Sequence, residues 1–352
     1  MKARVMEKRL NDFQERRSIY SIDGLRGLAA CAVMLFHFTA NTTIHLSSNN
    51  PFSYLFKEGH YGVEVFFLIS GFVIPYSLYR NGCVTVRDFY EFMKKRVVRI
   101  DIPYVSVIVL ELALIGLSAL TPWGGSQAKA LGWENILLHL GYLNSLTGHT
   151  WLLPIFWTLA IEFQFYLLIA LAFPLMHMHK LCHYLSILLF VELSLVCPDK
   201  AIIFNHLIFF AVGVLLYYYK TGKFNIKDFL IVAAVLFITI GVNYGFLLLC
   251  FLVVSCFAIV LVKKSSKVLS FLGKISFAIY LLHIPIGGRL LALAESLNFA
   301  EPIKIISLVI AIIITIICSY IFYQFIEMPA IQLSKRLATD RHNKISGQLT
   351  MA

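Results

Sequence analysis

Arg26 and His37 are the two residues whose spacing points most directly to chemistry. They are eleven positions apart in an apolar stretch that begins Asp23-Gly-Leu-Arg-Gly-Leu-Ala-Ala. Eleven positions make three helical turns plus about 20°, so both side chains lie on one helix face, roughly 16 Å apart along the axis. A cation near one end and a buried imidazole suit a long anionic ligand with a buried reactive end. An arginine that reaches the membrane surface and a histidine bonded to a neighbouring helix fit the spacing equally well.

Glu64 lies in a second apolar stretch, Gly62-Val-Glu-Val-Phe-Phe-Leu-Ile-Ser-Gly. This stretch enters from the opposite side, so we expect Glu64 to approach the depth of His37. A carboxylate beside an imidazole fixes its tautomer and stabilises its protonated form. The alternative is a glutamate that faces the lipid headgroups. Ser70 and Gly71 of the same stretch are more typical of tight helix packing than of chemistry.

Arg96 and Arg99 end a basic segment and are three residues apart, so they share a helix face. Paired guanidinium groups bind phosphates through two parallel hydrogen bonds. The alternative is ordinary anchoring at the membrane surface by basic residues, which the composition alone favours.

Two polar stripes lie on other apolar stretches. Thr158, Glu162 and Tyr166 recur every four residues and share one face. A polar stripe in lipid needs a partner or a water-filled cavity, which favours a role at a site. The second stripe contains His283, which is also typical of a satisfied core histidine. The residues expected to support the site are Asp23, Ser70, Trp157, Glu162, Tyr166, Ser276, Tyr280 and His283.

The composition says which elements must position these residues. The chain has 352 residues, of which 59% are hydrophobic and 14% charged, with a mean hydropathy of +0.79. Soluble domains carry about 25% charged residues, so the composition excludes soluble and disordered proteins. We predict an all-α, polytopic membrane protein with about ten spans. They are 24–42, 62–79, 102–120, 155–176, 183–197, 202–219, 228–242, 244–262, 273–293 and 303–326, with a further short helix in 133–146.

Three boundary predictions follow from the local signals. Asp23 is expected to cap the start of the first membrane helix. The segment 80–101 is expected to be a basic loop. Glu327 and Pro329 are expected to end the last helix, with the carboxylate near a cation.

The basic residues indicate an orientation. Placed on ten alternating spans with the N-terminus inside, 25 of the 30 Lys and Arg residues fall on the cytoplasmic side. The five others are Lys57, Lys129, Lys200, Arg289 and Lys304. This asymmetry predicts that both termini are cytoplasmic. It also explains the net charge of +11 without a nucleic-acid partner. We divide the chain into a cytoplasmic segment 1–19, a transmembrane domain 20–330 and a cytoplasmic tail 331–352.

Taken together, these motifs resemble the membrane-bound acyltransferase 3 family. The resemblance rests on the D-G-L-R-G start, the Arg26–His37 pair, the G-V-E-x-F-F stretch, the Arg96–Arg99 segment, W-T-L-x-x-E-x-x-F-Y, and the S-x-x-x-Y-L-x-H and E-x-P elements, in order over 20–330. It implies transfer of an acyl group, commonly acetyl from acetyl-CoA, to hydroxyls of cell-envelope glycans or small molecules. Many relatives carry an SGNH hydrolase-like domain after the last helix. Only about 25 residues follow here, so we expect a stand-alone form.

On this basis we expect a membrane-bound O-acyltransferase of the bacterial cytoplasmic membrane. It moves an acyl group from acyl-CoA on the cytoplasmic side to a hydroxyl of a cell-surface glycan, namely O-antigen, capsule or exopolysaccharide. His37 acts as general base with Glu64 beside it, and Arg26, Arg96 and Arg99 bind the acyl-CoA. The rival route is a covalent acyl-histidine. The expected partners are the lipid bilayer, acyl-CoA and a glycan or glycolipid acceptor, while the oligomeric state stays open. Acyl-CoA is a co-substrate, and no resident cofactor or metal is expected. The alternative function is a proton-coupled transporter of a glycolipid or small molecule, although no inverted repeat is visible.

Overall fold

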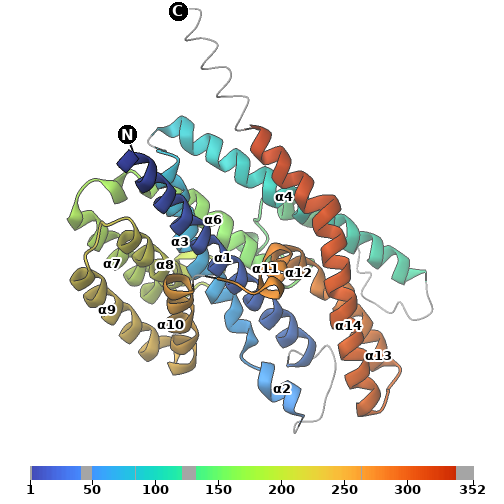
Figure 1. Cartoon of the computed structure of the whole chain (residues 1–352). Coiled ribbons are helices and arrows are strands. Elements are labelled where there is room, and N and C mark those ends of the chain that lie inside the picture. Colours follow the sequence, from blue (N-terminus) through green and yellow to red (C-terminus); the bar gives the residue numbers. More distant parts are fainter. Residues whose placement is uncertain (1, 41–49, 84, 121–131, 263, 338–352) are drawn as a thin grey trace, which may run out of the picture.

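The computed structural model describes residues 2–40, 50–83, 85–120, 132–262 and 264–337. Those residues form helices joined by turns, with no strand among them (Figure 1). Seven helices are long and apolar enough to cross a membrane, and two shorter apolar helices accompany them. The prediction of an all-α, polytopic membrane protein is therefore confirmed.

Each predicted span coincides with at least one described helix, whereas α2 lies outside all of the spans and α11 lies mostly before the span 273–293. Their bounds are α1 Lys2–Thr39, α2 Pro51–Phe56, α3 Gly62–Arg80, α4 Val86–Ala119, α5 Trp133–Leu140, α6 Phe156–Ala172, α7 Lys180–Val196, α8 Leu207–Lys220, α9 Ile226–Tyr244, α10 Phe246–Leu261, α11 Lys267–Lys274, α12 Ser276–Leu282, α13 Arg289–Ser296 and α14 Glu301–Phe322. A π-helical segment, His283–Gly288, joins α12 to α13, and another, Tyr323–Glu327, follows α14. The short helix predicted within 133–146 is α5.

Two predictions about the starts of helices are wrong. Asp23 lies inside α1 and does not cap it, because no glycine or proline precedes Gly24 to stop the helix. The segment expected to be a basic loop is helical from Val86 and continues unbroken into the third span. A capping box starts this helix: Asp88 N donates to Thr85 Oγ1 (3.2 Å) and Thr85 N donates to Asp88 Oδ2 (3.0 Å).

The predicted end of the last helix, at Glu327 and Pro329, is also wrong. The helix continues past Pro329 to Leu337. Pro329 follows the π-helical segment Tyr323–Glu327, where the regular i to i−4 hydrogen bonding is already interrupted. The proline therefore removes a bond at a place where the ladder is irregular, and the chain stays helical.

Helices α7 to α10 gather on one side of the molecule and α4, α13 and α14 on the other, with α1, α11 and α12 between them (Figure 1). Within the first group, every residue of α8 from Leu207 to Tyr218 is buried. It crosses α3 closely, because a Cβ added to Gly213 would lie 2.1 Å from the Leu68 carbonyl oxygen. Gly71 therefore serves packing, as its sequence context indicates: an added Cβ there would lie 2.2 Å from the Phe210 oxygen.

Helix α1 is held against α11 by a second pair of glycines. A Cβ on Gly273 would lie 2.1 Å from the carbonyl oxygen of Asp23, and one on Gly27 would lie 2.7 Å from the Gly273 nitrogen. The two backbones thus touch at the turn of α1 that carries Arg26. This contact fixes where the Arg26 side chain emerges.

Candidate active site

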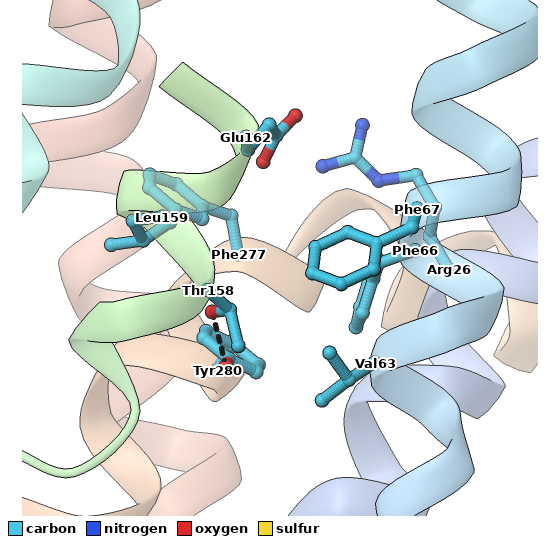
Figure 2. Close-up of a pocket in the computed structure, with 9 residues that line it drawn as sticks. All are labelled: Arg26, Val63, Phe66, Phe67, Thr158, Leu159, Glu162, Phe277 and Tyr280. Atoms are coloured by element: carbon cyan, nitrogen blue, oxygen red, sulfur yellow. Dashed lines mark hydrogen bonds between the residues drawn. The ribbon is translucent and has the colours of Figure 1, made fainter. Parts of the chain in front are cut away.

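A small pocket lies where α1, α3, α6 and α12 converge (Figure 2). Most of its walls are apolar, with polar groups concentrated at two ends. The lining residues are Arg26, Val63, Phe66, Phe67, Thr158, Leu159, Glu162, Phe277 and Tyr280. A larger groove between α8, α9 and α10 is lined almost wholly by hydrocarbon and aromatic side chains, so it offers little for catalysis.

Arg26 and Glu162 mark one end of this pocket. Figure 2 shows the guanidinium and the carboxylate pointing toward each other across it. Arg26 Nε is buried and has no hydrogen-bond partner among the described residues. Glu162 Oε1 accepts a hydrogen bond from Ser70 Oγ (3.0 Å) and a short one from the Tyr166 hydroxyl. The polar stripe of α6 thus serves the pocket, and Ser70 adds a hydrogen bond to it.

A second, smaller pocket adjoins the first, because both are lined by Leu159 and Glu162. It brings Arg96 close to aromatic rings: the guanidinium carbon lies 5.7 Å from the Tyr166 ring centroid and 5.2 Å from that of Phe92. Cation–π contacts of this kind hold a guanidinium in place without neutralising its charge. Arg96 therefore remains available to an anion.

Basic and acidic side chains lie close together around Arg26 of α1. Arg99 lies within electrostatic range of Arg26, Arg96 and the carboxylate of Glu327. Glu327 is buried and interacts with both Arg26 and Arg99. Asp23 interacts with the same two arginines and with Lys274. The three predicted acyl-CoA arginines are thus together. We call Asp23, Arg26, Arg96, Arg99 and Glu327 the arginine cluster.

Two hydroxyl groups meet at the opposite end of the pocket. Thr158 Oγ1 and the Tyr280 hydroxyl are 2.6 Å apart, and Thr158 Oγ1 also donates to the Ile155 carbonyl oxygen (2.9 Å). Ser276 shares its helix with Tyr280, but its hydroxyl donates locally to the Gly273 carbonyl oxygen (2.8 Å) and does not line the pocket. Trp157 also lies outside the lining and packs on the His206 ring, with centroids 5.4 Å apart.

His37 lies beyond the hydroxyl end of the pocket, behind two ring contacts. The centroids of Tyr280 and His283 are 5.9 Å apart, and those of His283 and His37 are 5.2 Å apart with the planes tilted by 38°. His283 is fully buried, whereas His37 is half-buried. His60, on the turn before α3, is within electrostatic range of His37. The structure therefore places His37 next to a second imidazole.

Glu64 occupies the first turn of α3. Its Oε2 is buried and has no hydrogen-bond partner among the described residues. It lies within electrostatic range of Tyr61 and Tyr280. Glu64 is therefore close to the hydroxyl end of the pocket, while its pairing with His37 stays a prediction.

Asp101 and Tyr142 line the second pocket and were not anticipated. The Tyr142 hydroxyl donates to Asp101 Oδ1 (2.8 Å). Asp101 directly precedes the predicted span 102–120, and its position two residues after Arg99 and two before Pro103 is the sequence signal that could have marked it. Tyr142 follows α5. In α5 the buried His139 accepts a hydrogen bond from the Leu152 N–H at Nε2 (2.9 Å), which joins the two ends of the connection between α5 and α6. Burial lowers the pKa of His139, which keeps this nitrogen available as an acceptor.

The family model for the acyltransferase domain matches residues 19–324. The chain belongs to the acyltransferase 3 family. The O-acetyltransferase OatA of Staphylococcus aureus (strain NCTC 8325 / PS 47) is 26% identical over 372 residues, which cover 92% of this chain and 58% of that protein. The family inferred from the motifs is thus confirmed, and the chain spans little more than half the length of this relative.

Two shorter matches cover part of the membrane domain. The peptidoglycan O-acetyltransferase OatA of Listeria monocytogenes is 29% identical over 161 residues, covering 44% of this chain and 24% of that protein. The putative peptidoglycan O-acetyltransferase YrhL of Bacillus subtilis is 29% identical over 165 residues, with the same shares. No solved structure matches. Among the described residues, no three His, Cys, Asp or Glu side chains are grouped to hold a metal ion.

Proposed function

We propose that this protein transfers an acyl group, acetyl in the first instance, from acyl-CoA on the cytoplasmic side to a hydroxyl of a cell-envelope glycan. Membership of an acyltransferase family supports the reaction type. The names of the relatives, O-acetyltransferase and peptidoglycan O-acetyltransferase, support acetyl as the group and a cell-wall glycan as the acceptor class. One structural observation carries the proposal: the pocket has Arg26 of the arginine cluster at one end and the hydroxyls of Thr158 and Tyr280 at the other, with the His283 ring beside Tyr280 and the His37 ring beyond His283.

The donor binds with its phosphates at the arginine cluster. Arg26, Arg96 and Arg99 carry three positive charges, while Asp23 and Glu327 limit their mutual repulsion. Guanidinium groups bind phosphate oxygens through charge-assisted hydrogen bonds, and the unpartnered Nε of Arg26 is ready to donate one. The largely apolar walls of the pocket suit the pantetheine arm, whose thioester then lies toward Thr158 and Tyr280.

Transfer needs a base for the acceptor hydroxyl. His37 takes the hydroxyl proton as the oxygen bonds to the thioester carbonyl carbon. The C–S bond then breaks, the thiolate leaves, and the proton on His37 neutralises it. The Tyr280 hydroxyl, once it turns away from Thr158 and the Ile155 carbonyl oxygen, donates to the oxyanion of the tetrahedral intermediate. The acceptor reaches His37 from the outer face.

Transfer of radiolabelled acetyl from acetyl-CoA by the purified protein in lipid nanodiscs tests this function. We expect His37→Ala to lower the transfer rate by at least about 10²-fold while acetyl-CoA binding persists, because the base is lost and the arginine cluster is intact. His179→Ala is the matched control, since His179 is an exposed histidine before α7. A wild-type protein that neither binds nor consumes acyl-CoA would refute the proposal. Full transfer activity of His37→Ala would reject His37 as the general base.

The same assay separates direct transfer from an acyl-histidine. Without an acceptor, a covalent route leaves a burst of label on the wild-type protein and none on His37→Ala. General-base catalysis leaves both proteins unlabelled.

A further inference from the structure

The groove between α8, α9 and α10 takes no part in the proposed reaction. Its volume is about 510 Å³, and its described lining is apolar apart from the Tyr219 hydroxyl and the Cys256 thiol. Sites for small ligands commonly have about 300–1,000 Å³. The groove is therefore large enough to hold a hydrocarbon chain.

The length of the groove matches one leaflet of a bilayer. On α9 its lining runs from Ile226, the first residue of the helix, to Phe237. Eleven helical residues rise about 16 Å, which is close to half of a hydrocarbon core about 30 Å thick. The lining also reaches Tyr219 near the end of α8 and Leu261 at the end of α10. These ends adjoin the start of α9, because consecutive helices joined by short connections alternate in direction.

Three exposed lysines lie at this end of the groove. Lys220 ends α8, one turn after Leu216 of the lining. Lys227 lies three positions before Leu230, which also lines the groove. Residues three or four apart share a helix face, so both lysines continue the lined faces. Lys264 follows the end of α10.

Other charged residues near these helix ends have partners elsewhere. Asp228, in the first turn of α9, is paired with Lys180 of α7 (2.6 Å) and does not line the groove. The Nζ of Lys223 lies 5.8 Å from the ring centroid of Tyr79 in α3, so we do not include Lys223 in the site. The three remaining lysines lie at the end of the helices that the basic residues assign to the cytoplasm. Basic groups between helices at that surface attract anionic lipid headgroups.

We propose that this groove binds an anionic phospholipid of the cytoplasmic leaflet. One acyl chain lies along α8, α9 and α10, and the phosphate lies at Lys220, Lys227 and Lys264. Anchoring at the membrane surface explains basic residues at helix ends, but it does not explain a groove of one-leaflet length that leads to them. A lipid of the outer leaflet would carry its phosphate on the opposite side of the membrane, away from these lysines. The inference does not depend on the proposed acyl transfer, because no residue of this site lines the catalytic pocket or belongs to the arginine cluster.

Native mass spectrometry of the delipidated protein tests the headgroup. The protein is titrated with phosphatidylglycerol or with phosphatidylcholine of identical acyl chains. We expect the first phosphatidylglycerol to bind at least about 10-fold more tightly than phosphatidylcholine. The triple variant Lys220→Gln/Lys227→Gln/Lys264→Gln should weaken phosphatidylglycerol binding roughly 10- to 100-fold and leave phosphatidylcholine binding unchanged.

A matched triple variant is the control for the loss of charge. Arg87→Gln/Lys94→Gln/Arg336→Gln removes three exposed basic residues of α4 and of the helical segment after α14, none of which lines the groove. We expect it to bind both lipids as the wild type does.

Two tryptophan variants of α9 test the acyl-chain part of the site. Ala234 is exposed and lines the groove, whereas its exposed neighbour Val235 does not line it. We expect Ala234→Trp to fill the groove and weaken phosphatidylglycerol binding by at least about 10-fold, because the acyl chain loses its apolar contact. Val235→Trp should bind as the wild type does. The thermal midpoint of each variant reports whether it is folded.

Equal affinities for the two lipids, or unchanged phosphatidylglycerol binding by the lysine variant, would overturn the proposal. Full binding by Ala234→Trp would also overturn it, because the lysines would then attract lipid without the groove. Dimers that disappear in Ala234→Trp but persist in Val235→Trp would assign the groove to a second copy of this chain instead. None of these outcomes bears on the proposed acyl transfer, which the assay with radiolabelled acetyl-CoA tests separately.

Discussion

At the scale of single residues, the environment of Arg26 favours ligand binding. It lines the pocket opposite Glu162, and its buried Nε has no hydrogen-bond partner among the described residues. A buried donor without an acceptor is costly, and an anionic ligand would relieve that cost. Arg26 is therefore better explained by binding than by anchoring at the membrane surface.

We expect Arg26→Gln to weaken acetyl-CoA binding by roughly 10- to 100-fold, since a charge-assisted hydrogen bond contributes about 1.5–3 kcal/mol. Arg26→Lys keeps the charge and loses less. The measurement is the Kd of acetyl-CoA in nanodiscs, with Arg87→Gln as the control because Arg87 is an exposed arginine in the first turn of α4. Equal Kd values for Arg26→Gln and wild type would place the phosphates elsewhere.

Spacing within one helix predicted which residues face the same way, and the structure agrees for Thr158, Glu162 and Tyr166. Spacing could not predict partners on other helices. The contact of His37 with His283, and that of Tyr142 with Asp101, join residues far apart in the chain. Such pairs depend on how helices cross, which no short-range periodicity encodes.

At the scale of helices, hydropathy located a helix in each apolar run but not the true helix ends. Apolar runs report where a helix is surrounded by lipid or core, whereas backbone hydrogen bonding continues into polar sequence until a breaker intervenes. The polar starts of α1 and α4 are helical for this reason. The arginines of α4 are consequently on a rigid helix and not on a loop, which suits a binding site.

The closest helix crossing yields a stability prediction. We expect Gly213→Ala to destabilise the protein by at least about 1–3 kcal/mol, the usual cost of overpacking. The added Cβ would lie 2.1 Å from the Leu68 carbonyl oxygen and would push α3 away from α8. Gly116→Ala in α4 is the control, since nothing lies within 4 Å of its added Cβ, and alanine favours a helix. Thermal unfolding in detergent should show a lower midpoint for Gly213→Ala only. Equal midpoints would mean that α3 and α8 can move apart to accept the added Cβ without loss of stability.

At the scale of the whole molecule, the charge distribution and the proposed donor site favour the same orientation. Arg26 of the arginine cluster lies near the start of the apolar part of α1, Ser21–Thr39, at the end that the basic residues assign to the cytoplasm, and the proposed acyl-CoA donor would come from that side. On the opposite side, two of the five basic residues are paired with carboxylates: Arg289 with Glu111 (2.6 Å) and Lys304 with Glu295 (2.8 Å). These pairings leave even less net positive charge on the outer face. His37, at the other end of α1, is then closer to that face.

Labelling with a membrane-impermeant maleimide tests this orientation. In a background that lacks the seven native cysteines, we expect Lys57→Cys and Lys200→Cys to react in intact cells. Asn81→Cys and Lys264→Cys should react only after the membrane is permeabilised, because their loops carry the basic excess. All four positions are exposed, so burial does not confound the comparison. The reverse pattern would put the arginine cluster outside, away from acyl-CoA, and the proposed direction of transfer would fail even if the fold and the pocket stand.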